Sequence, residues 1–429
     1  MKYILIAIIG ALASMLANKG IAVFNDGFRP IIPQYFEGKM RRSELAATSF
    51  AVSFGLVIGF GIPASIGASI FLVHSILLAT DIIGTFFKDD LKGLIGAGVV
   101  GALYGVGLLF GLDSIVNLFE KLPYNFLGDL GMVSSPVVSM FAIFPAVAIA
   151  MQHGFKKGAI AGIIVTLAYF LVKRFGTFSI GEATVALNAE GIGLLIGVVI
   201  MLIYAMREKG TKSSNEDLLN VFSDKVERIQ KNWWMLSIMG GLLSASAAMN
   251  LIAGDPASLA LMKEGQFTNA AIASLARAIG FIPLVFSTAI VTGVYGTAGV
   301  TFVWGVGILL HGNPLVAFVA GALVMFIEVK LIGVFARGLD KFPGIRDMGE
   351  HIRTSMSKVL SIALLVGSVN AANTMAPGVG ALFVAGVYLL NKQSKKPLVD
   401  LAVGPVAAII FGILLNILIA LGIHVLPVE

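Results

Sequence analysis

The stretch VTGVYGTAGVT, residues 291–301, carries three glycines and three threonines between two apolar runs. Glycine and threonine are poor helix formers, so this composition is unusual for a helix that crosses a bilayer. Unwound backbone in lipid leaves N–H and C=O groups unpaired at a cost of several kcal/mol each, and it persists only inside protein or beside a wet cavity. The stretch therefore predicts an interrupted helix in the interior of a membrane protein.

The composition of the whole chain points the same way. It has 429 residues, of which 57% are hydrophobic and 13% charged, and its mean hydropathy is +0.93. Runs such as 4–24 and 401–423 reach the roughly 18–20 apolar residues that cross a bilayer. We expect an all-α polytopic membrane protein with about fourteen apolar segments in the lipid bilayer.

Several function classes are excluded by residues that the chain lacks. There is no cysteine, which excludes disulfides and cysteine-ligated metals, and five scattered histidines do not form a zinc site. The phosphate-binding pattern G-x-x-x-x-G-K-[ST] is absent. We therefore expect no enzyme, no metal site and no cofactor beyond a coupling Na⁺ or H⁺. The net charge of +6 does not indicate a nucleic-acid partner, because in a membrane protein the positions of the cations matter more than their sum.

The positions of the cations predict the topology. With the N-terminus outside and every segment crossing, most of the 30 lysines and arginines fall in inner loops. Both termini are then outside. Residues 1–17 resemble a secretory signal, but the internal repeat needs this segment, which favours its retention.

A polar linker, 207–231, divides the chain into a first repeat, 1–206, and a second, 232–429. The string IIGALAS (8–14) aligns with IMGGLLS (238–244), and Met151 and Gly154 align with Met375 and Gly378. Seven segments per half is an odd number, so the second half enters the membrane inverted. Inverted repeats are typical of secondary transporters, whose sites lie near the midplane on broken or re-entrant helices. The centre of the linker is expected to form an amphipathic helix on the membrane surface.

Two symmetric pairs of interruptions supply the candidate solute site. GFGIPASIGAS (59–69) is the partner of 291–301, and MQHG (151–154) is the partner of NAANTMAPG (370–378). Their hydroxyl, amide and imidazole groups are the candidate substrate-binding groups: Ser65, Ser69, Gln152, His153, Thr297, Thr301, Asn370 and Asn373. Three alternatives remain: helix packing for the small residues, an interfacial position for His153, and interhelical hydrogen bonds for the two asparagines.

Ionisable residues inside apolar runs are costly and often functional. Asp81 is the candidate for ion coupling, and its alternative role is to cap a segment near the inner interface. The candidate gate residues or charge partners are Asp26, Arg29, Arg277 and Glu328. In the loop 22–38 the alternative is a structured elbow in which Asp26 pairs with Arg29. Glu328 and Lys330 are two residues apart and do not face each other on a helix, so each needs a partner elsewhere.

Five strings resemble the YhfT family of bacterial inner-membrane proteins. They are AVFNDGFRPIIPQYFEGKMRRSE (22–44), ARAIGFIPLVFSTAIVTGVYGTAGVTFVW (276–304), LGMVSSPVVSMFAIFP (130–145), LLVGSVNAA (364–372) and PVAAIIFGILLN (405–416). The resemblance implies a bacterial inner (plasma) membrane location and a transport role. The inverted halves are also distantly similar to the membrane components of the ascorbate and galactitol phosphotransferase systems. That similarity implies a homodimer with an elevator-type mechanism, by analogy of fold.

We expect this protein to be an ion-coupled secondary transporter of a small, polar, anionic solute such as a sugar acid. The alternative is a non-transporting membrane scaffold or receptor subunit that anchors a cytoplasmic partner through 207–231. A channel is disfavoured, because no charged or carbonyl-rich filter repeats four-fold.

Overall fold

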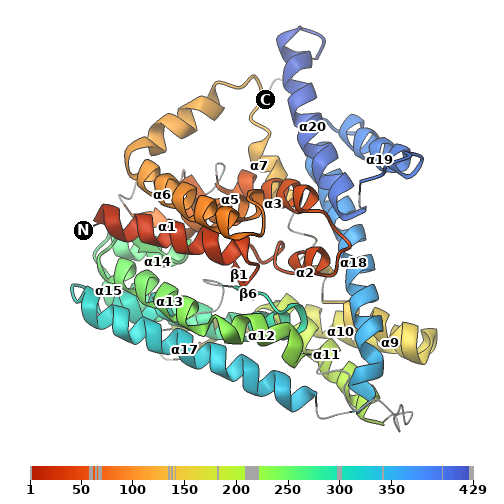
Figure 1. Ribbon diagram of the computed structural model, residues 1–429, viewed down its shortest axis with the longest axis horizontal. Coiled ribbons are helices and arrows are strands. Elements are labelled where there is room, and N and C mark those ends of the chain that lie inside the picture. The colour runs from red at the N-terminus through yellow and green to blue at the C-terminus, as the bar shows by residue number, and fades with distance from the viewer. Residues whose placement is uncertain are drawn as a thin grey trace. The chain divides into compact units, whose positions relative to one another are not determined.

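The computed structural model describes residues 2–57, 61–62, 65, 70–133, 136, 139–140, 142–180, 183–207, 222–296, 302–340, 343–398 and 400–424. The described chain is mostly helical (Figure 1). Its strands form three short two-stranded pairings. It forms two compact units. Unit 1 contains 1–19, 34–137 and 361–429, and unit 2 contains 20–33 and 138–360. Each unit draws on both halves of the sequence, so the units are a different division from the predicted repeats.

Unit 1 is built around α1, which packs against α5 and α6. Its elements are α1 (Lys2–Asn18), α3 (Arg42–Leu56), β2 (Phe71–Leu72), α5 (Val73–Phe86), α6 (Leu91–Glu120), α7 (Leu127–Leu130), the 3₁₀ turn η2 (Gly131–Val133), α19 (Val379–Lys392) and α20 (Asp400–Ala420). The short helix α2 (Ile32–Phe36) lies at the boundary between the units, and α18 (Pro343–Met375) runs from unit 2 into unit 1.

Two glycines allow α1 and α6 to cross closely. A Cβ on Gly10 would lie 2.2 Å from the carbonyl oxygen of Gly101, and a Cβ on Gly101 would lie 2.3 Å from that of Gly10 and from Oγ of Ser14. Small residues at such crossings are the usual means by which apolar helices approach each other. The crossing therefore depends on glycine at both positions.

The end of α5 is held by side chains from α1 and α3. The last carbonyls of a helix lack partners within it. Nδ2 of Asn18 donates to the Gly84 carbonyl at 2.9 Å, and Arg42 donates to the carbonyls of Gly84 and Phe87, both at 2.8 Å. These bonds tie α1, α3 and α5 together at one end of the unit.

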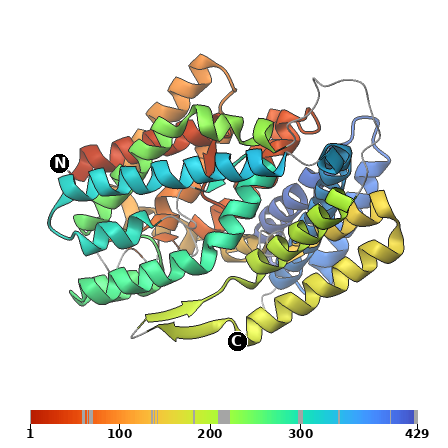
Figure 2. The same cartoon turned by 90° about the horizontal axis from the view of Figure 1, so that it is seen from below.

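Unit 2 is built around α13 and α17, with α15 and α16 beside them. Its elements are β1 (Ala22–Val23), α9 (Phe144–His153), α10 (Phe155–Phe175), β3 (Thr177–Ile180), β4 (Ala183–Ala186), α11 (Ala189–Arg207), α12 (Ser223–Lys231), α13 (Trp233–Ala248), β5 (Ile252–Ala253), α14 (Pro256–Lys263), α15 (Phe267–Thr292), β6 (Tyr295–Gly296), α16 (Val303–Leu309) and α17 (Pro314–Leu339). The antiparallel hairpin β3–β4 lies between α10 and α11 and was not expected from the sequence (Figure 2).

The α13–α17 crossing repeats the features of the α1–α6 crossing. A Cβ on Gly240 would lie 2.8 Å from the carbonyl oxygen of Gly321. A Cβ on Gly321 would lie 2.6 Å from that of Gly240 and 2.3 Å from Cβ of Ser244. Gly240 and Ser244 are the residues that the sequence aligns with Gly10 and Ser14. The two units thus use the same pair of small residues for the same purpose.

The order of elements recurs as well. From α1 to α6 and from α13 to α17 the chain runs helix, two-residue strand, short helix, helix, two-residue strand, helix and long helix. Later, α9 and α18 are each followed by a glycine with positive φ, Gly154 (φ 91°) and Gly378 (φ 77°), which begins the next helix. These are the glycines that the sequence alignment pairs.

The expected interruption near 291–301 begins in the described residues. Of the expected interruption at 59–69 the structure describes only Gly61, Ile62 and Ser65, which are helical, and the described break follows at Ile70–Leu72. The helix α3 ends at Leu56, and α5 begins at Val73 after the extended residues Phe71–Leu72. The helix α15 ends at Thr292, and Gly293 adopts the left-handed conformation (φ 69°) that favours glycine. The extended pair Tyr295–Gly296 follows, and α16 begins at Val303.

Among the described residues, six helices are long and apolar enough to cross a membrane, or seven if α15 counts as one span despite its 49° bend between Ile279 and Leu284. Pro283 lies in the bend, and proline inside a helix removes a backbone donor. The other apolar helices of the described chain, such as α1, α5, α13 and α19, are shorter. This is fewer than the fourteen segments expected, and 293–310 in particular contains only the seven residues of α16 as described helix.

Candidate functional site

A buried carboxylate in unit 2 is the centre of the candidate site. Glu328 lies near the middle of α17, one of the candidate membrane spans, and its side chain is only 6% exposed. The hydroxyl of Tyr295 in β6 donates to Oε2 of Glu328, and the backbone N–H of Phe302 donates to Oε1 at 3.3 Å. Glu328 therefore connects α17 to both ends of the interruption that precedes α16.

A buried arginine lies on the other side of the same strand. Arg29 is fully buried, and its guanidinium forms an ion pair with Asp26, the pairing that the loop sequence allowed. A Cβ on Gly296 would lie 2.9 Å from Cζ of Arg29. The guanidinium therefore lies against the backbone next to Tyr295, where glycine leaves room for it. Asp26, Arg29, Tyr295 and Glu328 together form what we call the buried polar cluster.

Strand pairing brings these parts of the chain together. β1 pairs in parallel with β6, with Ala22 opposite Tyr295 and Val23 opposite Gly296, and the N–H of Tyr295 donates to the Ile21 carbonyl at 3.0 Å. The turn after β1 is fixed by Asn25, whose Oδ1 accepts the N–H of Gly27 at 2.9 Å. An Asx side chain of this kind makes a compact turn and positions the residues that follow it.

Helix α12 supports the interruption from a third direction. Nζ of Lys225 donates to the Val291 carbonyl at 2.9 Å, and a Cβ on Gly293 would lie 2.2 Å from the Lys225 carbonyl oxygen. Oδ1 and Oδ2 of Asp340, at the end of α17, accept the N–H groups of Phe222 and Ser223 at 2.9 and 2.7 Å. The centre of the linker, 208–221, lies outside the described residues. α12 forms the last nine residues of the linker, and its side chains Val226 and Ile229 are buried.

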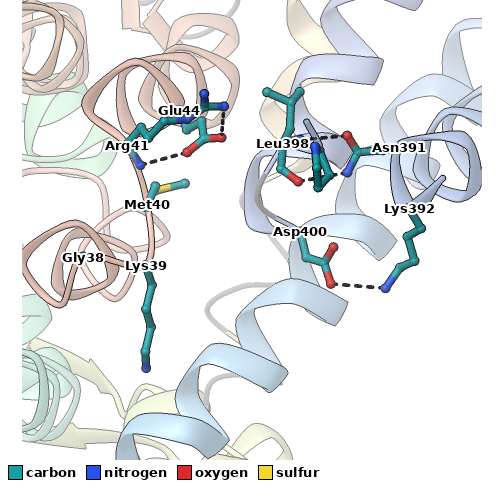
Figure 3. A pocket seen from close by; sticks show the side chains of 10 residues that line it. Gly38, Lys39, Met40, Arg41, Glu44, Asn391, Lys392, Leu398 and Asp400 are labelled. Carbon is teal, nitrogen blue, oxygen red and sulfur yellow. Dashed lines mark hydrogen bonds and ion pairs between the residues drawn. The ribbon is translucent and has the colours of Figure 1, made fainter. Parts of the chain in front are cut away.

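A second candidate is a polar surface pocket of about 540 Å³ in unit 1. Figure 3 shows Arg41 and Glu44 on one side of it and Asn391, Lys392 and Asp400 on the other. Each charge is matched locally: Arg41 pairs with Glu44 at 2.6 Å and Lys392 with Asp400 at 3.3 Å. Asn391 exchanges two hydrogen bonds of 2.9 Å with the backbone of Leu398. Of these groups only Glu44 is buried, and exposed paired charges contribute little binding energy, so the buried polar cluster is the stronger candidate.

The residues predicted to bind a solute are divided between the units. Ser65, Asn370 and Asn373 belong to unit 1, whereas Gln152 and His153 belong to unit 2. Ser69, Thr297 and Thr301 lie outside the described residues. Their shared role in a solute site stays a prediction.

Several of these side chains have a local structural role. Oγ of Ser65 donates to the Gly61 carbonyl at 2.6 Å and accepts the N–H of Leu72 at 2.8 Å. Oδ1 of Asn373 accepts the N–H of Gly378 at 2.8 Å and so fixes the turn after α18. The ring of His153 lies 5.3 Å from that of Tyr204. The bond of Asn373 is to the turn after its own helix and not to another helix, and the amide of Asn370 is exposed.

Asp81 and Arg277 lie outside the buried polar cluster. Asp81 is buried in α5, about one turn before Gly84, whose carbonyl accepts hydrogen bonds from Asn18 and Arg42. The guanidinium of Arg277 in α15 lies 4.6 Å from the ring centre of Phe281. Among the described residues no group of three or more His, Asp or Glu side chains could hold a metal ion.

The sequence alone did not identify Tyr295 as part of the site. Its signal was present, because it is the one aromatic residue in the glycine- and threonine-rich stretch 291–301. Its partner Glu328 is 33 residues away in the chain, and no helical or strand spacing relates the two positions.

Apolar helices of membrane-spanning length, interrupted helices and a buried polar cluster within a candidate span are the features of a helical membrane protein. The sequence model of the YhfT family, described as a protein of unknown function, matches residues 2–424, and the chain belongs to that family. It is 36% identical over 440 residues to the uncharacterized protein YhfT of Escherichia coli (strain K12), covering 99% of this chain and 98% of that protein. No solved structure matches the chain.

Proposed function

We propose that this protein is an ion-coupled secondary transporter of a small polar solute. The observation that carries the proposal is the combination, in unit 2, of an interrupted helix and a buried polar cluster at the middle of a candidate membrane span. Non-helical backbone and charged side chains are costly in a bilayer and are found where they line a solute or ion path. A purely structural span has no need of either.

The recurring elements support the transporter class further. The matched crossings Gly10–Gly101 and Gly240–Gly321, and the matched glycines Gly154 and Gly378, are what an internal repeat would produce. Repeats with opposite orientation in the membrane are common among secondary transporters. We propose that the two halves are inverted, and that the protein works as a homodimer by an elevator-type movement, with sugar acids as the first solute class to test.

A thermal-shift screen of the purified full-length protein tests the proposal first. Sugars, sugar acids and amino-acid derivatives are added in sodium and in potassium buffers at two pH values. A solute that binds the folded state raises the melting temperature in proportion to its affinity. We expect a sugar acid or a related polar solute to do so, with a dependence on sodium or on pH.

Uptake of each positive solute into proteoliposomes then tests transport itself. Gln152→Ala and Asn373→Ala should reduce uptake, while the exposed amides Gln266→Ala and Asn269→Ala serve as matched controls. Binding without any uptake would favour the alternative of a receptor or scaffold subunit. No positive solute in the whole screen, together with no uptake, would contradict the proposal.

A further inference from the structure

Glu328 differs from the other carboxylates of the candidate membrane spans in its position. Glu190 and Asp400 lie in the first turns of α11 and α20, where they can reach the aqueous side. Glu328 lies 14 residues after the first residue of α17 and 11 before the last. If α17 crosses the bilayer, this carboxylate is near the midplane, where ionisable groups commonly serve ion or proton transfer.

The charged groups around Glu328 are engaged elsewhere. Lys330, on the same helix, lies 5.3 Å from the ring centre of Trp233, and Arg29 pairs with Asp26. On α12, Lys225 donates to Val291 and Arg228 donates to the Gly20 carbonyl at 3.2 Å. The remaining charged residues on elements packed against α17 are Asp224, Glu227, Lys231 and Arg277, and α13 and α16 have none. In the part of the chain that the structure describes, Glu328 forms no ion pair.

Two neutral donors hold the carboxylate instead, the hydroxyl of Tyr295 and the N–H of Phe302. A sodium ion needs several oxygen ligands, and both oxygens of Glu328 already accept hydrogen bonds. A proton needs only one lone pair. The geometry therefore fits a proton better than a metal cation at this position.

We infer that Glu328 is a reversible proton-binding site and that its hydrogen bond with Tyr295 transmits the protonation state to the interrupted helix. The use of this site in transport rests on the proposed function. With Glu328 ionised, the Tyr295 hydroxyl donates to it. When a proton from solution binds Oε2, the new O–H of Glu328 donates to the Tyr295 oxygen. The tyrosine hydrogen is then released to another acceptor. Protonation thus reverses one hydrogen bond at the start of the interruption 295–302.

Unit 1 offers an internal reference for this site. Leu108 lies seven residues after Gly101 on α6, as Glu328 lies seven residues after Gly321 on α17. Seven residues are close to two helical turns, so each residue lies on the same helix face as its crossing glycine. A buried leucine is sufficient for packing at this position in unit 1, which indicates that the carboxylate in unit 2 serves another purpose.

Infrared difference spectroscopy of the full-length protein in lipid nanodiscs tests the inference without any solute. We expect a carboxylic C=O band that appears and disappears reversibly as the pH is changed. Glu328→Gln should abolish this band, and Tyr295→Phe should shift its frequency, because one hydrogen bond is lost. Asp400→Asn, at the exposed carboxylate of unit 1, should leave the band unchanged.

The absence of a titrating band in the wild-type protein, or its survival in Glu328→Gln, would overturn the inference. If Glu328→Gln does not fold, Tyr295→Phe decides alone, and an unchanged band in that variant would overturn it. Solute uptake is scored separately. Uptake without a titrating Glu328 band rejects only this inference, whereas a titrating band without uptake of any solute rejects only the proposed function.

Discussion

The α1–α6 crossing of unit 1 and the α13–α17 crossing of unit 2 are made in the same way but have different residues two turns further on. Both rely on a glycine in each helix and a serine one turn from the first glycine. After Gly101 the corresponding residue is Leu108, and after Gly321 it is Glu328. What the crossings share is the requirement for close packing. The residue that differs is Leu108 in unit 1 and Glu328 in unit 2. This difference indicates that the side chain at this position in unit 2 serves a function other than packing.

The largest expected effect is the loss of either crossing. Gly101→Ala and Gly321→Ala each place a Cβ within 2.6 Å of a backbone oxygen that cannot move without shifting a helix. Overpacking of this kind costs about 1–3 kcal/mol or more in the free energy of unfolding. Both variants should show a clearly lower melting temperature.

The controls lie on the same two helices. Gly107 in α6 and Gly338 in α17 have open space where a Cβ would be, so Gly107→Ala and Gly338→Ala should be neutral or slightly stabilising. A large loss in one crossing with none in the other would show that the two are not equivalent.

The next effect concerns the residue at which the crossings differ. Glu328→Leu introduces the residue that unit 1 has, but it leaves the Tyr295 hydroxyl and the Phe302 N–H without their acceptor. An unsatisfied buried polar group costs about 1–3 kcal/mol. Tyr295→Phe removes the donor instead.

A double-mutant cycle of Glu328→Leu and Tyr295→Phe, followed by thermal unfolding, measures the coupling between the two side chains. We expect the double variant to lose less stability than the sum of the single variants, by about 0.5–3 kcal/mol. Additive losses would show that the two groups do not interact.

A smaller effect is expected in the surface pocket of unit 1. Lys392→Ala and Asp400→Asn each remove the exposed ion pair between these two residues, and such pairs typically contribute about 0.2–1 kcal/mol. Their melting temperatures should stay close to that of the wild type, and closer still at high salt. A loss as large as that of Glu328→Leu would reverse the ranking of the two candidate sites.

The smallest effect is a pH dependence at Asp129 in the short helix α7. Burial raises the pKa of Asp129, and the hydrogen bond from the Tyr124 hydroxyl, 2.7 Å long, offsets part of this rise. The folded protein then binds this proton more tightly than the unfolded chain. The stabilising contribution is therefore present at low pH and is lost as the pH rises through the raised pKa.

Asp129→Asn removes this titration and keeps an oxygen that can accept from Tyr124. Melting temperatures of the two proteins between pH 7 and pH 4 provide the measurement. The wild type should gain stability relative to the variant as the pH falls, by a small amount. A relative loss on acidification would contradict the direction of the shift.

The sequence predicted the local features of the fold well. Glycine-rich composition indicated the interruption that begins at Gly293, and the alignment of Gly10 with Gly240 paired two glycines that each lie at a helix crossing. The spacing of Asp26 and Arg29 allowed their ion pair. Each of these depends on residues close together in the chain or on a direct comparison of similar strings.

Contacts between distant segments could not be predicted in the same way. The parallel pairing of Ala22–Val23 with Tyr295–Gly296 depends on how the whole of unit 2 folds. The hairpin β3–β4 was missed because each strand has only four residues, so the alternation of Phe178 and Ile180 with Thr177 and Ser179 covers a very short run. The sequence has fourteen apolar segments, whereas six or seven described helices are long enough to cross a membrane, because apolar composition does not distinguish a full crossing from a short buried helix such as α16.

The contact between Lys225 and the interruption has a consequence for how this family varies. The backbone of α12 fills the space beside Gly293, and its lysine holds the Val291 carbonyl, although the two segments are 66 residues apart in the chain. A substitution at either position changes the environment of the other. Glycine at 293 is therefore favoured twice, by its left-handed φ and by the α12 backbone beside it, and relatives that retain α12 should retain this glycine.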